Sequence, residues 1–132
     1  MAESSPWLYQ AWQTDDGLAD NSVTGVAQTS DGYLWVATLG GLMRFNGAEF
    51  KAIPLLNLLG VPNRVVRAMF KDRQDCLWLG MERGPVICLG PDAARTFSTQ
   101  EGIPETRVAA MAQDREGAIW MAFSSGLCRI KE

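Results

Sequence analysis

The sequence predicts an all-β protein built from repeated four-stranded antiparallel sheets, on the basis of a sequence repeat, a turn pattern and a lack of helical periodicity. The chain has 132 residues, 47% hydrophobic and 20% charged, which is typical of a globular domain with a core. Trp35, Trp78 and Trp120 are separated by 43 and then 42 residues, and glycine and valine anchors keep the same intervals. We therefore expect one domain over residues 1–132, made of three copies of one unit.

The first unit contains four short strands bounded by turn signals. Its apolar and β-branched runs cover residues 23–29, 33–38, 42–45 and 50–53, the composition that strands favour. No segment sustains the i, i+3, i+4, i+7 apolar spacing of an amphipathic helix. Each unit is therefore expected to form an antiparallel meander.

Four strands in a unit of about 42 residues are typical of one β-propeller blade. The units are expected at residues 17–59, 60–101 and 102–132. The third unit supplies only three strands, whereas residues 8–13 have the register of a fourth strand. We therefore expect a split last blade, with 8–13 as the leading outer strand.

The split blade predicts association of copies of the chain. Closed propellers have about 4–8 blades, so three blades do not close a ring by themselves. Copies are expected to join head to tail, each lending residues 8–13 to the next, so that a dimer has six blades and a trimer nine. The alternative is that the chain is a piece of a longer propeller.

The composition argues against several classes of function. The chain has no histidine and a net charge of −3, which argues against Ser–His catalysis, His-bearing zinc sites and nucleic-acid binding. No cofactor and no metal site are implied. No apolar run approaches the roughly 20 residues that span a bilayer, and no signal peptide is recognisable. We expect either a cytoplasmic chain or a mature or shortened chain to which Met1 was added.

The three cysteines, Cys76, Cys88 and Cys128, are widely spaced and form no CxxC pair. A disulfide framework is therefore not expected. Cys76 is also expected to be mildly strained, because it is aligned with Gly32 at a turn position that favours positive φ.

The tryptophan of each second strand is expected to pack between neighbouring blade sheets, where a large ring buries much apolar area. The alternative is that Trp35, Trp78 and Trp120 stack on a carbohydrate.

Two stretches resemble a known repeat. They are GLADNSVTGVAQTSDGYLWVATLGGLMRFNGAEF, from Gly17, and GIPETRVAAMAQDREGAIWMAFSSGLCRI, from Gly102. Both resemble the two-component regulator propeller repeat, which reads roughly DGL-P-x-N-x-V, I-x-x-D-x-x-G-x-L-W-I-G-T and G-L-x-R-F. The resemblance covers the chain from Tyr9 onward and is partial in the second unit. The first unit departs from it at Ala19 and at residues 28–29, where the family usually has proline and an acidic pair.

The resemblance implies a ligand-sensing extracytoplasmic propeller, or a piece of one, from a bacterial two-component signal-transduction receptor. Such propellers stand ahead of a membrane helix and an output module such as a histidine kinase or a diguanylate cyclase, and some members sense oligosaccharides. It therefore implies a periplasmic, non-catalytic domain that does not itself insert into the membrane.

The candidate ligand site lies in the polar links before the innermost strands, near the central channel. Its candidate residues are Asn21, Asn63, Arg64, Thr106 and Arg107. Arg64 and Arg107 are expected at the same place in the second and third units, with Ser22 in the first. Arginine and asparagine side chains can bind the hydroxyls or carboxylates of a sugar acid. Alternatively, the asparagines only fold their own turns and the arginines are solvated.

Two other functions stay open. A protein-interaction scaffold without a small ligand is the main alternative, because fold alone does not decide function. A carboxylate-dependent glycan-active enzyme is the weaker one, because nothing in the spacing selects a pair among Asp15, Asp16, Asp20, Glu101 and Glu105. We therefore assign no catalytic residue and expect no enzyme activity.

Overall fold

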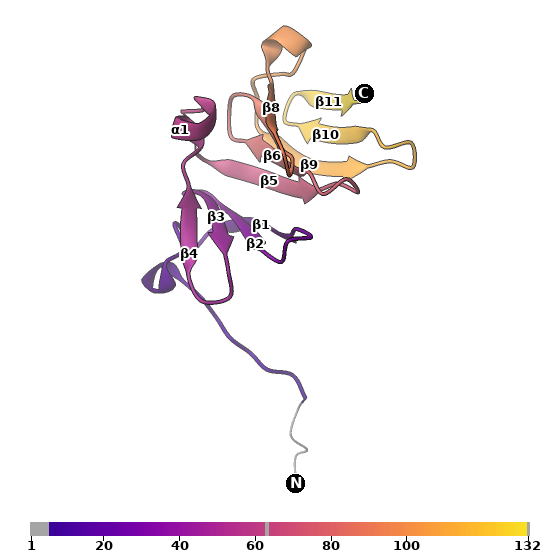
Figure 1. The fold of residues 1–132 in the computed structure, drawn as a ribbon. Helices are drawn as coiled ribbons and strands as arrows, with labels where there is room; N and C mark the ends of the chain where they lie inside the picture. Colours follow the sequence, from indigo (N-terminus) through magenta and orange to yellow (C-terminus); the bar gives the residue numbers. More distant parts are fainter. Residues whose placement is uncertain (1–5, 63, 132) are drawn as a thin grey trace.

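The computed structural model describes residues 6–62 and 64–131 and folds them into three antiparallel sheets in chain order (Figure 1). Blade 1 comprises β1 (Val23–Gln28), β2 (Leu34–Thr38), β3 (Gly41–Phe45) and β4 (Phe50–Ile53). Blade 2 comprises β5 (Val66–Lys71), β6 (Leu77–Met81), β7 (Val86–Leu89) and β8 (Ala94–Phe97). Blade 3 comprises β9 (Val108–Gln113), β10 (Ile119–Phe123) and β11 (Gly126–Ile130). Each sheet is a meander of neighbouring strands, so the predicted all-β propeller fold is confirmed.

Short helical turns interrupt the links between the blades. They are η1 (Thr14–Asp16), α1 (Leu55–Leu59) and η2 (Thr99–Glu101). The sequence did not predict α1, because five residues are too few to show a periodic stripe. Gly60 ends α1 in the left-handed conformation, with φ of 69°, which glycine adopts without a steric penalty.

Blade 2 lies between the other two blades, because its innermost strand β5 contacts both β1 and β9. One apolar core forms between blades 1 and 2 and includes Ala37, Val66 and Leu79. A second core forms between blades 2 and 3 and includes Trp78 and Val108. Apolar side chains of successive sheets therefore hold the blades face to face.

The second interface is closely packed at a glycine of β6. A Cβ atom at Gly80 would lie 2.5 Å from the side chain of Val108 in β9, closer than real Cβ contacts. Blade 1 has Ala37 at the corresponding place, at 0% exposure. The approach of β9 to β6 therefore requires glycine at residue 80.

The predicted leading strand is absent from this structure. Residues 8–13 have no strand pairing. Toward the N-terminus the segment leads away from blade 1 (Figure 1), whereas the ring of Trp12, close to η1, still contacts Phe45. Leu8 is 96% exposed and Tyr9 92%. An extended segment becomes a strand only beside a sheet edge that completes its hydrogen bonds, and no described edge lies beside this one.

The expectation about cysteines is wrong. Cys76 and Cys88 form a disulfide, with their Cα atoms 6.2 Å apart. Cys88 of β7 is paired directly with Trp78 of β6, which puts it diagonally across from Cys76, on the same face of blade 2. The positive φ of the preceding turn is also not at Cys76, because Asp75 carries it, at 66°.

Candidate functional site

The tryptophan of each second strand is fixed by a hydrogen bond to the turn before it. The indole Nε1 of Trp78 donates to Asp72 Oδ2 at 2.8 Å, and that of Trp120 donates to Asp114 Oδ2 at 2.8 Å. In blade 1, Trp35 Nε1 donates to the hydroxyl of Thr29 at 2.9 Å. The three rings therefore take equivalent places in their blades.

The surroundings of these rings differ. Trp35 is half-buried and packs against the core between blades 1 and 2, and Trp78 is 6% exposed in the core between blades 2 and 3. Trp120 is half-buried in blade 3, and the guanidinium of Arg129 lies 5.8 Å from its ring centroid. Packing between blades is thus visible for the first two rings, and for Trp120 it stays a prediction.

The links before the innermost strands are tied to the hairpin between the second and third strands of the same blade. The carbonyl oxygens of three link residues accept backbone hydrogen bonds at 2.9–3.1 Å from Leu39, Glu82 and Ser124. The accepting residues are Ser22, Val65 and Arg107. The expected equivalence of Arg64 and Arg107 is therefore wrong by one residue, because Val65 holds the place of Arg107 in blade 2.

The structure separates the predicted site residues. The side-chain oxygen of Asn21 accepts a hydrogen bond from the backbone N of Thr14 at 2.8 Å, so Asn21 shapes its own link. Arg64 is exposed, and Asn63 lies outside the described residues. Thr106 and Arg107 are the candidates that the structure brings together, at the link before β9.

Thr106 and Arg107 line a cavity of about 420 Å³ between blades 2 and 3. Its other lining residues are Glu82, Arg83, Glu105 and Ser124. Glu82 is ion-paired with Arg67, and the hydroxyls of Thr106 and Ser125 are 2.8 Å apart. The site thus combines carboxylates, guanidinium groups and hydroxyls at one end of the blades.

Sequence reasoning missed Glu82, Arg83 and Ser124. These residues lie in the turns that follow the second strands of blades 2 and 3, β6 and β10. In an antiparallel meander that turn lies at the same end of the sheet as the link before the first strand. The antiparallel order of the predicted strands could therefore have placed these residues beside the link before the first strand, and so in the candidate site.

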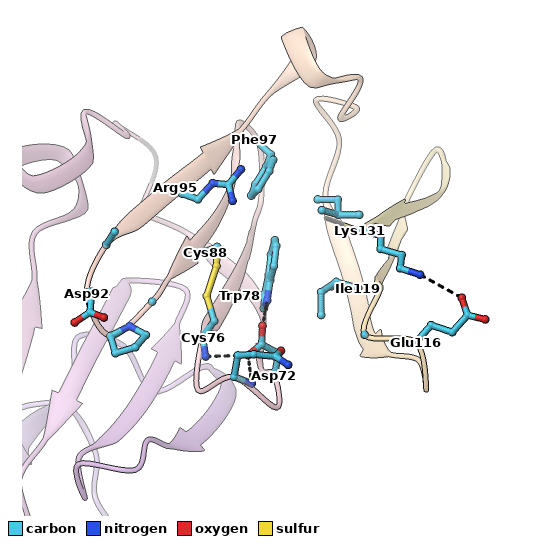
Figure 2. A pocket seen from close by; sticks show the side chains of 16 residues that line it. Asp72, Cys76, Trp78, Cys88, Asp92, Arg95, Phe97, Glu116, Ile119 and Lys131 are labelled. Atoms are coloured by element: carbon cyan, nitrogen blue, oxygen red, sulfur yellow. Dashed lines mark hydrogen bonds and ion pairs between the residues drawn. A yellow bond between two sulfur atoms is a disulfide. The ribbon is translucent and has the colours of Figure 1, made fainter.

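A second cavity, of about 630 Å³, opens between the outer strands of blade 2 and the hairpin of blade 3 (Figure 2). On one side the rings of Trp78 and Phe97 stack, with centroids 5.6 Å apart, beside the Cys76–Cys88 disulfide. On the other side Lys131 Nζ lies 3.5 Å from Glu116 Oε2, near Ile119. This cavity is mostly apolar around the aromatic pair and forms where blade 3 has no fourth strand among the described residues.

Within the described residues, no cluster of three or more carboxylate or cysteine side chains could hold a metal ion. The same part of the chain contains no helix that is long and apolar enough to cross a membrane.

Comparison with known proteins identifies the family that two of the repeats resemble. Residues 17–40 and 60–83 match the family described as Two component regulator propeller. Histidine kinase P4 of Formosa agariphila is 38% identical over 50 residues, which are 38% of this chain and 4% of that protein. The resemblance inferred from the sequence is confirmed, although the matched segments lie in the first and second units rather than in the first and third.

Solved structures from B. thetaiotaomicron have the same fold. The extracellular domain of the hybrid two component system BT4673 is 26% identical, with a TM-score of 0.72 over 92% of this chain. That of BT3049 is 21% identical, with a TM-score of 0.72 over 87% of this chain, and shows the fold alone. The chain spans only 17% and 16% of those two structures.

Proposed function

Because the chain carries two-component regulator propeller repeats, we propose that it forms part of the ligand-sensing extracytoplasmic propeller of a bacterial two-component receptor. The observation that carries the proposal is the likeness to an extracellular two-component domain over 92% of the chain at 26% identity. Nearly all of the chain, rather than one motif, therefore has the architecture of such a domain.

The disulfide between Cys76 and Cys88 supports a periplasmic location. Structural disulfides persist in oxidising compartments and are rare in the cytosol, where thiols are kept reduced. This support is independent of the repeat, because neither cysteine is a residue of the repeat pattern: Cys76 takes an unspecified position and Cys88 replaces the arginine that Arg44 supplies in blade 1.

An oligosaccharide or a sugar acid is the ligand class that we propose for the cavity at Thr106 and Arg107. Its mixture of guanidinium, carboxylate and hydroxyl groups suits a ligand with many hydroxyls and a carboxylate. A purely anionic polymer suits it less, because Glu82 and Glu105 also line the cavity.

A non-catalytic role is supported by the carboxylates of the links. Asp16 caps the N-terminus of η1 and accepts from Gln13 N at 2.8 Å, and Asp20 accepts from Ser22 N at 2.7 Å. Hydrogen bonds from Ser98 hold the pKa of Glu101 below its ordinary value. A glycosidase acid needs a raised pKa instead, so these groups serve as turn caps.

The test is a binding titration with acidic and neutral oligosaccharides, followed by calorimetry on three variants. Arg107→Ala should weaken binding at least tenfold, because it removes a charge-assisted contact at the cavity, which corresponds to about 1.4 kcal/mol. Arg64→Ala should have a smaller effect, since Arg64 does not line the cavity. Arg115→Ala removes the same charge from an exposed turn and should change nothing. Equal affinities for Arg107→Ala and Arg115→Ala would count against the site.

A protein-interaction scaffold is the second candidate function, and two exposed leucines of α1 favour it. Leu56 is 59% exposed and Leu58 63%, and they lie on the link between blades 1 and 2. If this surface binds a protein partner, Leu56→Glu and Leu58→Glu should abolish capture of that partner and leave oligosaccharide binding unchanged.

A further inference from the structure

We propose that residues 9–12 of one copy of the chain complete blade 3 of a second copy, as its fourth strand. The proposal rests on the repeat geometry and not on the proposed ligand. It commits to one occupant for the free edge of β11, namely the N-terminal segment of another copy.

The segment has the register of a fourth strand. The turn after it, η1, has a capping box between Gln13 and Asp16 and ends at Gly17 with φ of 107°. The turn after β8, η2, has the same capping box between Ser98 and Glu101 and ends at Gly102 with φ of 91°. Since β8 ends immediately before Ser98 and residues 9–12 end immediately before Gln13, the segment stands where a fourth strand stands in blade 2.

Side-chain packing supports the same assignment. Trp12 takes the place of Phe97 in this register, and its ring contacts Phe45 edge-on with centroids 5.6 Å apart. Phe97 correspondingly lines a cavity together with Ile130 of the next blade. Phe45 and Ile130 are equivalent, because they pair with Leu34 and Ile119 at the starts of β2 and β10. Trp12 therefore already packs against blade 1 as the outer strand of a preceding blade does.

The acceptor edge is β11. In blades 1 and 2 the third strand pairs on its outer side with β4 or β8, whereas among the described residues β11 pairs with β10 alone. Leu127 of β11 is 65% exposed. An unpaired edge is a template for another strand.

The segment and the free edge of one copy are too far apart to meet. Blade 2 lies between blades 1 and 3, and the N-terminal segment leaves blade 1 on the side away from β11 (Figure 1). The segment also exposes apolar rings, with Trp7 at 75% and Tyr9 at 92%. Pairing between copies would cover the exposed rings of the segment and the outer edge of β11 at once. Pairing within one copy would require the blades to rearrange.

The register of blade 2 predicts the contacts. Ile87 pairs with Thr96 and Val86 with Phe97. By the repeat interval, Cys128 should face Ala11 of the second copy, and Leu127 should face Trp12. Directly opposed residues in neighbouring antiparallel strands have Cα atoms about 4.5–5.5 Å apart, within the range of Cα separations that a disulfide bridges.

The first measurement is the mass in solution by light scattering on a size-exclusion column. The full chain should have the mass of two or three chains, corresponding to six or nine blades. A chain from which residues 6–12 are deleted should have the mass of one chain and keep the circular-dichroism spectrum of a folded β protein, because the pairing within blades 1, 2 and 3 does not involve those residues. A monomeric full chain at micromolar concentration, or an unchanged mass after the deletion, would overturn the proposal.

Cross-linking tests the register without depending on the deletion. Ala11→Cys should form an interchain disulfide with Cys128 under mild oxidation, and Cys128→Ser should prevent it. Gln10→Cys is the matched control, because its side chain points to the opposite face of the strand and should cross-link at least tenfold less. Equal cross-linking of Gln10→Cys and Ala11→Cys overturns the register, and a Cys128–Cys128 dimer of the unmodified chain overturns the pairing itself.

Discussion

Blades 1 and 2 build the same turn before the second strand with different chemistry. In blade 2 one buried carboxylate holds the whole turn: Asp72 Oδ1 accepts from the backbone N of Gln74 and of Cys76 at 2.9 Å, and Oδ2 accepts from Trp78. In blade 1 two residues share this task. Thr29 accepts from Trp35 and donates to Asp31 Oδ1 at 2.6 Å, and the same oxygen accepts from Tyr33 N at 3.1 Å.

The blades also differ at one cross-strand pair. In blade 1 the guanidinium of Arg44 lies 4.2 Å from the centroid of the Tyr33 ring. The corresponding residues of blade 2 are Cys76 and Cys88, and a disulfide joins them. The repeat therefore fixes where an interaction is needed, whereas the residues that supply it vary from blade to blade.

The largest effect is expected from Asp72→Ala, because Asp72 is 6% exposed and serves three donors. Leaving buried donors without an acceptor should lower the free energy of unfolding by about 3 kcal/mol. Thr29→Ala in blade 1 should cost about 1 kcal/mol, since Trp35 is half-buried and Asp31 stays in place. Urea denaturation of both variants measures the difference, with Asp92→Ala as an exposed control. Equal losses at Asp72 and Thr29 would show that the two turns are energetically the same.

Reduction of the disulfide should have the next largest effect. Cys76 and Cys88 are 12 residues apart, and closing a loop of this size stabilises the folded state by about 2–3 kcal/mol. Arg44→Ala in blade 1 should cost only about 0.5–1 kcal/mol, the range for an accessible cation–π pair.

Urea denaturation with and without reductant checks the disulfide. The unmodified chain should lose stability in reductant, and a Cys76→Ala, Cys88→Ala double variant should not respond to it. A double variant that is as stable as the oxidised chain would contradict the assigned role.

The sequence predicted the sheets because the repeat and the turn residues act locally. The four predicted strands of the first unit match β1 to β4 to within one residue at each end. The strand predicted at 8–13 is absent for a non-local reason, since a strand requires a neighbouring sheet edge and none lies beside this segment among the described residues. The helix α1 was not predicted because its five residues lie in the link between blades 1 and 2 and are too few to show the apolar periodicity of a helix.

The lining of the candidate cavity was predictable only in part. Thr106 and Arg107 line it and were candidates because the link before an innermost strand is recognisable from the repeat, whereas their role as a ligand site stays a prediction. The error at Arg64 and the positive φ wrongly given to Cys76 are both one-residue register errors in the second unit, in opposite directions, because Val65 follows Arg64 and Asp75 precedes Cys76. Counting back from Trp78, rather than from the Asp-Gly signal of the first unit, places Asp75 at the turn position of Gly32 and Gly117, which have φ of 94° and 91°. Predicting the disulfide also requires knowing that Cys88 is the cross-strand partner of Trp78. The turn after β6 has one more residue than the turns after β2 and β10, so the repeat interval does not give this partner.

The smallest effect is expected at Asp31, the carboxylate of blade 1 that accepts hydrogen bonds from the Thr29 hydroxyl and from Tyr33 N. The hydrogen bond from the Thr29 hydroxyl, followed by that from Tyr33 N, holds the pKa of Asp31 below its ordinary value of 3.8. A lowered folded-state pKa stabilises the fold above pH 3.8, and this contribution is lost as the pH falls through the folded-state value. Thr29→Ala should raise the pKa of Asp31 toward its ordinary value, and Asp31→Asn should make stability less dependent on pH in this acidic window.

Carboxyl-carbon NMR titration measures the pKa of Asp31 directly, so the result does not depend on how acid unfolds the rest of the chain. Asp114 of blade 3 supplies the contrast within the same sample, because the pKa of its carboxyl is lowered chiefly by the indole N–H of Trp120. Thr29→Ala should move the titration of Asp31 and leave that of Asp114 in place. If both carboxyls shift together, the substitution acts through the fold as a whole, and the division of labour between Thr29 and Asp31 is not what distinguishes blade 1.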